Sequence, residues 1–261
     1  MSLNSKYHYF NNYNQPLLIL LPVLLLLLLA LTIDQSQQYC AKFGRHLLQH
    51  QCVLTPESSE GPFYLPYHLT RRDVREDREG LPFVLKLTVT DVNTCEPLNN
   101  VTVDIWQADA SGEYSGYVRA SPSGGGHSPP SDNATFLRGI QMTDQNGQAE
   151  FMTIFPGWYD PRTTHIHLQT HLAGRTLHTG QLYFPDKMVA RIGRYYPYNN
   201  TKYVRMNNAE DWLFKRFNGQ DSMIQRFKPL RGRRLANGLV GEIIVGLDPN
   251  MDSKEALHGR G

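Results

Sequence analysis

The segment Phe83–Asp91, with the sequence FVLKLTVTD, alternates large apolar side chains with polar or smaller ones. Successive side chains of an extended chain point to opposite faces, so the large apolar ones would gather on a single face. These are Phe83, Leu85, Leu87 and Val89. A period of two predicts a half-buried β-strand and not an amphipathic helix.

Similar short segments follow along the chain, with turn-forming residues between them. They are VTVDIW (101–106), TDQNGQAEFMTIF (143–155), THIHLQTHL (164–172), TGQLYF (179–184) and GEIIVGL (241–247). No helix-length amphipathic segment separates these strands. The sequence therefore predicts an all-β protein, a β-sandwich of antiparallel or mixed sheets with long loops and few short helices.

Two local features add detail to this prediction. Asn146-Gly147 stands between alternating flanks and predicts a β-hairpin, because this dipeptide favours the tight turns that join antiparallel strands. The segment NNAEDWLFKRF (207–217) predicts a short helix capped by an asparagine, with Trp212 or Leu213 sharing an apolar side with Phe217.

The composition is that of a globular protein without a strong electrostatic field. The 261 residues are 40% hydrophobic, which is enough to bury a sizeable core. Lys and Arg number 26 against 24 Asp and Glu, a formal net charge of +2. This balance argues against nucleic acid and anionic membranes as partners.

The N-terminus carries an almost uninterrupted apolar run, LLILLPVLLLLLLALTI (17–33). Its length fits a cleaved signal peptide or an uncleaved anchor, and we favour the signal peptide. The chain is then divided into a signal peptide or anchor (1–33), an N-terminal extension (34–54), a β-sandwich domain (55–250) and a C-terminal tail (251–261). Both alternatives predict a secreted or extracellular domain, with membrane contact only if the leader stays attached.

Two further features agree with a secreted protein. Glycosylation acceptor triplets begin at Asn100, Asn133 and Asn199. The cysteines, Cys40, Cys52 and Cys95, lack the clustered spacing of a zinc site. In an oxidising compartment two of them would pair, and the sequence leaves all three pairings open.

The segment FPGWYDPRTTHIHLQTH (155–171) is rich in side chains that bind metals. On a strand His165 and His167 point to the same face, so both imidazoles can reach one ion. His171 would lie roughly 13 Å beyond His167, too far for that ion, and a structural role is expected for it. Two histidines at this spacing also occur on ordinary polar faces, so a metal site needs further donors.

Two tyrosines near turns are candidate donors. Tyr159 lies in the Pro-Gly turn PGWY (156–159), and Tyr114 follows another turn in DASGEYSGY (109–117). A phenol with a pKa near 10 binds at neutral pH only to an ion acidic enough to displace its proton. Two imidazoles and two phenolates therefore favour iron(III), with copper(II) as the rival and zinc less favoured.

Several longer segments carry a family resemblance. They are LTPESSEGPFY (54–64), REDREGLPFVLKLTVTDVNTCEPL (75–98), VDIWQADASGEYSGY (103–117), FLRGIQMTDQNGQAEFMTIFPGWYDPRTTHIHL (136–168) and GQLYFPD (180–186). In this order they resemble the intradiol ring-cleavage dioxygenases, particularly their secreted single-domain members, from about Thr55 to Pro249. The resemblance implies non-haem iron(III) and O2-dependent cleavage of catechol-type rings between the two hydroxyl-bearing carbons, giving muconic acids.

The resemblance also implies a role for each site residue. The implied metal ligands are Tyr114, Tyr159, His165 and His167. The family's Gly-x-Tyr-Ser element selects Tyr114, and leaves Tyr117 to pack. Tyr159 matches the axial ligand that is released when a catecholate binds. Arg162 matches the catalytic arginine that stabilises negative charge on the substrate, and Gln181 matches the substrate-positioning glutamine.

Two departures from the family pattern bear on the predictions. The helical segment that cytosolic members use to form dimers has no counterpart before Thr55, so a monomer is expected. The interval from Tyr159 to His165 is shorter than in many of those members, which suggests an open pocket and a broader range of catechols. The alternatives are a non-catalytic sandwich that binds iron or phenols, and a secreted copper enzyme or adhesion-type sandwich.

Overall fold

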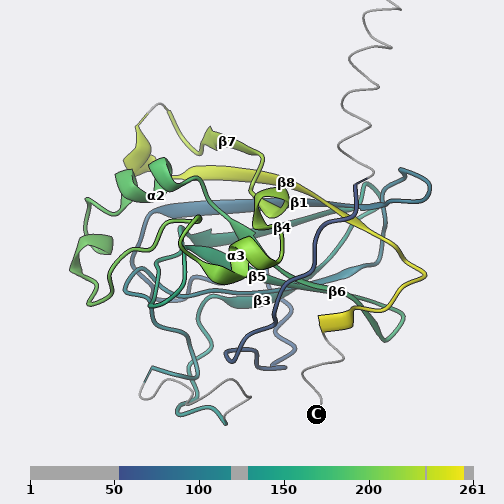
Figure 1. The fold of residues 1–261 in the computed structure, drawn as a ribbon, viewed down its shortest axis with the longest axis horizontal. Coiled ribbons are helices and arrows are strands. Elements are labelled where there is room, and N and C mark those ends of the chain that lie inside the picture. Colours follow the sequence, from purple (N-terminus) through teal and green to yellow (C-terminus); the bar gives the residue numbers. More distant parts are fainter. Residues whose placement is uncertain (1–52, 119–128, 233, 256–261) are drawn as a thin grey trace, which may run out of the picture. The chain divides into compact units, whose positions relative to one another are not determined.

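The structure, a computed structural model, describes residues 53–118, 129–232 and 234–255 of the chain. Its strands form two four-stranded sheets that lie as two layers (Figure 1). The first sheet has the order β4-β1-β8-β7 and the second the order β3-β2-β5-β6. The strands are β1 (Pro82–Asp91), β2 (Thr102–Trp106), β3 (Arg138–Met142), β4 (Gln148–Ile154), β5 (His165–Leu172), β6 (Arg175–Tyr183), β7 (Arg226–Pro229) and β8 (Leu239–Leu247).

The first sheet is mixed, and the second is antiparallel. Strands β1 and β8 run parallel to each other, whereas the other strand pairs are antiparallel. The alternation in β1 is confirmed, because its apolar face is buried in the core while Lys86 is exposed. The buried members are Phe83, Leu85, Leu87 and Val89. The predicted all-β sandwich of mixed sheets is therefore confirmed.

The helices of the described residues are few and short, as predicted. They are α2 (Asp186–Ile192), α3 (Trp212–Arg216) and the 3-10 turns η1 (Tyr198–Asn200), η2 (Gly219–Ser222) and η3 (Leu235–Asn237). None of these helices has the length and apolar character needed to cross a membrane.

The hairpin predicted at Asn146-Gly147 is wrong. The turn itself is present, since Asp144 Oδ1 accepts hydrogen bonds from the backbone N–H groups of Asn146 and Gln148, each at 2.9 Å. Gly147 adopts a φ of 69°, which favours glycine. However, β3 before the turn pairs with β2 and β4 after it pairs with β1. The turn therefore carries the chain from one sheet to the other.

The cap predicted for the helix near residue 207 is also wrong. Helix α3 is capped by Asp211, whose side chain accepts from the N–H groups of Leu213 and Phe214. These two residues are buried, whereas Trp212 is 56% exposed and does not form the apolar side. The cap lies four residues after Asn207, the start of the predicted helical segment. The start of the helix is set by the position at which Leu213 and Phe214 can pack against the core, and Asp211 is the residue that then caps it.

Several predictions about secretion concern residues outside the described part of the chain. The apolar run at 17–33, Cys40 and Cys52 all lie there. Cys95 is disulfide-bonded. The glycosylation triplets begin at exposed residues, namely Asn100, Asn133 and Asn199.

Strand β5 places the predicted site residues. It lies between β2 and β6, so that His167 is flanked by Trp106 on one side and Gln181 on the other. Ile166 and Leu168 point the other way and are fully buried in the core. The core on one face of β5 therefore fixes the orientation of the histidines on the other.

Candidate metal centre

The two histidines at the start of β5 converge on one point. His165 and His167 are 2% and 0% exposed, and their Nε2 atoms are 3.0 Å apart. His165 Nδ1 donates to the carbonyl oxygen of Thr163 at 2.7 Å, because a carbonyl can only accept. In the neutral ring this leaves the lone pair on Nε2, the atom that faces the convergence point.

The tyrosine oxygens reach the same point. Tyr114 Oη lies 3.5 Å from His165 Nε2, and Tyr159 Oη lies 3.4 Å from it. The structure thus brings together the four predicted ligands, two nitrogens and two oxygens, from β5 and two separate turns. Tyr114 is 2% exposed, whereas Tyr159 is only partly buried.

Burial of the cluster sets the protonation of its four side chains. Burial lowers the pKa of both His165 and His167, so the imidazoles stay neutral and can donate lone pairs. Burial raises the pKa of Tyr114 and Tyr159, so each phenol keeps its proton until a strong cation lies beside the oxygen. Among the described residues no three His, Cys, Asp or Glu side chains are grouped to hold a metal. A complete ligand set here therefore needs the tyrosine oxygens.

The turn before Tyr114 is held by one carboxylate. Asp109 Oδ1 accepts from the N–H groups of Ser111 at 2.9 Å and Glu113 at 3.1 Å. Gly112 adopts a φ of 93°, and a Cβ built there would lie 2.2 Å from the carbonyl oxygen of Trp158. The turn that carries Tyr114 therefore packs directly on the turn that carries Tyr159, and only glycine permits that approach.

We predict that Gly112→Ala destabilises the protein by about 3 kcal/mol, because the methyl group meets backbone that cannot move aside. Gly174→Ala is the matched control. Gly174 also has a positive φ, of 79°, but nothing lies within 4 Å of its Cβ position. This control should cost only about 1 kcal/mol in urea unfolding. Equal losses in the two variants would contradict the packing account.

Arg162 interacts electrostatically with Tyr159 and His165, and Gln181 lies opposite His167 on the neighbouring strand. Arg162 is 6% exposed, its Nη2 donates to Gln181 Oε1, and its Nε donates to Asp211 Oδ2 at 2.8 Å. Gln181 Nε2 donates in turn to the carbonyl oxygen of Ser59 at 2.8 Å. Hydrogen bonds from Nε and Nη2 thus fix the guanidinium, so its charge stays near the point where the histidine and tyrosine donors converge.

Aromatic side chains that the sequence did not single out enclose the cluster. Phe63 stacks on Tyr114 with ring centroids 4.2 Å apart, and meets Tyr159 edge-on at 5.4 Å. Trp106 stacks on His167 at 4.8 Å. The predicted packing role of Tyr117 agrees with its 4% exposure and its edge-on contact with Phe63. Phe63 and Trp106 lie in the segments that carry the resemblance, but nothing in their spacing predicts a place at the site.

His171 and His178 lie on the same sheet but outside the cluster. His171 is half-buried, and its Nδ1 lies 3.1 Å from Thr176 Oγ1, in keeping with a structural role. His178 is buried, and its Nε2 has no hydrogen-bond partner in the part of the chain that the structure describes. Burial lowers the pKa of His178 from 6.5 to about 4.

We predict that His178 makes the protein less stable in acid. Because the folded-state pKa is depressed, the unfolded chain binds a proton first, and stability is lost as the pH falls from about 6.5 toward 4. In urea unfolding at pH 7 and pH 5, His178→Gln should reduce this acid loss by about 2 kcal/mol. The variant of an exposed histidine, His68→Gln, should leave it unchanged. An acid loss that persists in full in His178→Gln would refute the assignment.

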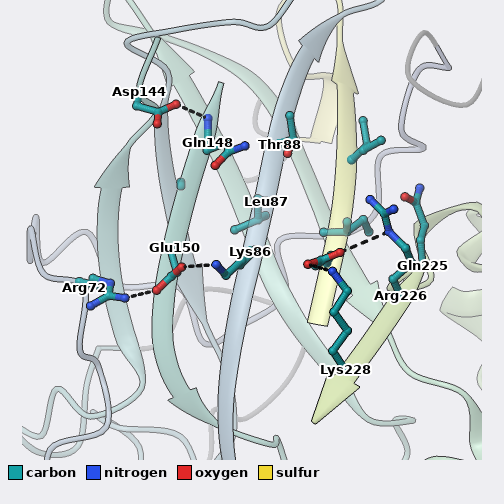
Figure 2. A pocket seen from close by; sticks show the side chains of 14 residues that line it. Arg72, Lys86, Leu87, Thr88, Asp144, Gln148, Glu150, Gln225, Arg226 and Lys228 are labelled. Carbon is teal, nitrogen blue, oxygen red and sulfur yellow. Dashed lines mark hydrogen bonds and ion pairs between the residues drawn. The ribbon is translucent and has the colours of Figure 1, made fainter. Parts of the chain in front are cut away.

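A cleft of about 530 Å³ lies elsewhere, on the outer face of the first sheet (Figure 2). Its carboxylates are held between cations: Glu150 contacts Arg72 and Lys86, and Glu242 contacts Arg226 and Lys228. The cations are largely exposed and pair with the partly buried carboxylates, so the cleft is a solvated ion-pair surface.

The fold and the cluster define a β-sandwich protein with a buried centre of two histidines and two tyrosines. A family model described as Dioxygenase matches residues 60–192. An intradiol ring-cleavage dioxygenase from Tetranychus urticae has a similar structure, with a TM-score of 0.74 and 37% identity, covering 78% of this chain and 98% of that one. The chain belongs to the intradiol ring-cleavage dioxygenase family.

Curated relatives match over shorter stretches. Catechol 1,2-dioxygenase from Acinetobacter baylyi is 33% identical over 110 residues, 40% of this chain and 32% of the relative. The beta chain of protocatechuate 3,4-dioxygenase from Burkholderia cepacia is 32% identical over 139 residues, 48% of this chain and 55% of the relative. The chain thus spans between a third and about half of the length of these two relatives.

Proposed function

We propose that this protein is a secreted non-haem iron(III) dioxygenase that cleaves catechol-type rings between the two hydroxyl-bearing carbons with O2, giving muconic acids. The observation that carries the proposal is the convergence of the His165 and His167 Nε2 atoms with the Tyr114 and Tyr159 oxygens. Family membership supports the same reaction class. The experiment that tests it is oxygen uptake by iron-loaded protein on adding catechol, with muconic acid as the expected product.

Iron(III) bound to these four side chains would act as a Lewis acid toward the catechol oxygens and make the ring reactive toward O2. The chain's own residues supply the rest. Tyr159 is the more exposed of the two tyrosines, so its oxygen is the one that can leave the cluster and accept a proton from a catechol hydroxyl. Tyr114 is held under Phe63 and stays in place.

Arg162 would supply fixed positive charge. Its guanidinium is already oriented by Gln181 and Asp211, so it can stabilise the negative charge that builds up on the substrate without rearranging. Gln181 lies on β6 directly opposite His167 of β5, which supports a role in contacting the substrate, and Phe63 would exclude water from the ring face. Together these residues bind, orient and shield a flat dianionic ring.

The alternative is a sandwich that binds iron or phenols without turning them over. The buried arginine beside the cluster favours catalysis, since a simple iron store has no need of an extra cation next to the metal. The two are separated by one measurement. Iron-loaded protein that binds catechol and consumes no oxygen would support the binding module and overturn the enzyme.

We also propose that the domain is secreted as a monomer. The apolar run at 17–33 and the disulfide at Cys95 support an oxidising compartment. Asn100, Asn133 and Asn199 are exposed and open to glycosylation. Expression of the full chain in a eukaryotic cell should release glycosylated, monomeric protein into the medium. Retention in the cytosol without glycans would contradict this.

The short interval from Tyr159 to His165 supports a broad range of substituted catechols. Product assays with catechol and a series of bulkier catechols test it. Turnover of the bulkier compounds within about tenfold of catechol is expected, which corresponds to a barrier difference of about 1.4 kcal/mol. Turnover confined to unsubstituted catechol would argue against an open pocket.

A further inference from the structure

The strongest unassigned feature beside the centre is a fully buried carboxylate, Asp211, which is 0% exposed. Its two oxygens face different parts of the fold. Oδ1 accepts from the N–H groups of Leu213 at 2.8 Å and Phe214 at 3.3 Å, which caps α3. Oδ2 accepts from Arg162 Nε at 2.8 Å and from the Thr163 N–H at 3.0 Å. One side chain therefore joins the capped helix to the segment that leads into β5.

The second oxygen acts on two groups of the centre at once. The bond from Nε, together with the bond from Nη2 to Gln181, fixes the plane of the Arg162 guanidinium. The bond from the Thr163 N–H holds the residue whose own carbonyl oxygen, in the next peptide unit, accepts from His165 Nδ1 at 2.7 Å. A metal-binding imidazole depends on such a partner for its orientation.

The charge of Asp211 matches this arrangement. Arg162 is buried, and a buried cation without an anion is strongly unfavourable. Burial disfavours the charged carboxylate, but the Arg162 guanidinium and the Thr163 N–H outweigh it and lower the pKa of Asp211. Arg162 and Asp211 are therefore both charged.

We propose that Asp211 is a positioning residue of the centre, which acts by orienting the Arg162 guanidinium and by holding the backbone at Thr163. This inference rests on the proposed function, because it assigns Asp211 to the same site. A helix cap alone needs only one oxygen, so the second oxygen has no role in α3. The position of Asp211, some fifty residues beyond Arg162 in the sequence, is why no local pattern reveals it.

The variant Asp211→Asn separates the two roles. An amide oxygen can still cap α3, since asparagine is as good a cap as aspartate, but the amide nitrogen cannot accept from Arg162 Nε. The variant Asp221→Asn is the matched control, because Asp221 is an exposed carboxylate at the neighbouring turn η2. The test compares four variants: Asp211→Asn, Asp221→Asn, Arg162→Gln and the double variant Arg162→Gln with Asp211→Asn.

In oxygen-uptake kinetics of the iron-loaded protein, Asp211→Asn should lower kcat about 10- to 100-fold and change KM less than about threefold. In the Arg162→Gln background the same substitution should cost less than about threefold more, because the guanidinium is already absent and only the contact with Thr163 remains to be lost. Asp221→Asn should behave as wild type. An equal loss from Asp211→Asn with and without Arg162 would make it a structural residue only and overturn the proposal.

Hydrogen exchange provides a second test that does not depend on turnover and can be applied to an inactive variant. In the protein loaded with Ga(III), a diamagnetic substitute, the Arg162 Nε–H proton should be protected from exchange in wild type and exchange at least about tenfold faster in Asp211→Asn. Unchanged protection would overturn the proposal. If Asp211→Asn does not fold, the double variant, which removes both buried charges, should fold again; failure of both would instead assign Asp211 to structure. Wild-type protein that consumes no oxygen contradicts the proposed function and leaves this exchange test intact.

Discussion

Replacing His165 with alanine is expected to abolish both iron binding and ring cleavage. His165 Nε2 lies within 3.5 Å of the other donor atoms of the centre, His167 Nε2 and the oxygens of Tyr114 and Tyr159. Removing it takes away one of two nitrogens and leaves two protonated phenols beside an empty space. We expect iron content to fall below detection after desalting and kcat/KM to fall on the order of 10³-fold, as measured by metal analysis and oxygen uptake.

The matched control is His171→Ala. His171 lies on the same strand, but its ring contacts Thr176 and not the centre. This variant should retain its iron and its activity within about twofold, since surface-near changes outside a site have small effects. Full iron content in His165→Ala, or loss of iron in His171→Ala, would show that the cluster is not the metal centre.

The second large effect is expected at Arg162. In Arg162→Gln the neutral side chain can still bond to its neighbours, but its charge is gone from the site. We expect kcat to fall about 10²- to 10³-fold, with KM and the colour of the iron-loaded protein almost unchanged, because the charge acts on the reacting substrate and not on the resting centre. Stopped-flow and steady-state oxygen uptake measure both constants.

Arg175→Gln is the control for this variant. Arg175 is an exposed arginine that bonds to Asp252 at 2.7 Å, on the same sheet as the centre. Its replacement should leave kcat within about twofold. A raised KM with kcat unchanged in Arg162→Gln would mean that the arginine only helps to bind substrate, contrary to the role argued above.

Local periodicity predicted β1 and β8 well, because each packs its apolar face against the core. The alternation in Phe83–Asp91 became β1, and the segment around His165 became β5. At Asn146-Gly147 the predicted turn is present, but the predicted pairing of the two flanking strands is wrong. A turn dipeptide predicts a change of chain direction, but long-range packing decides which strands pair. Here β3 and β4 belong to different sheets.

The candidate site could be predicted only in part from local pattern. His165 and His167 followed from the period of a strand, and the structure places them together. The choice of Tyr114 over Tyr117 needed the family resemblance, since both follow the same turn. Trp106, Phe63 and Asp211 were missed, because their contacts with the site join segments far apart in the sequence. Tryptophan and phenylalanine are usually core residues and aspartate is usually exposed, so no local pattern selected these three.

The measurement that tests the central claim most directly is the visible spectrum of the purified domain after iron loading, followed by oxygen uptake on adding catechol. The account predicts a red-brown protein, coloured by charge transfer from the Tyr114 and Tyr159 phenolates to iron(III). Its band should shift when catechol binds, and one O2 should be consumed per ring opened. A colourless protein that stays inactive after iron loading would contradict the assignment of Tyr114, Tyr159, His165 and His167 as an iron centre.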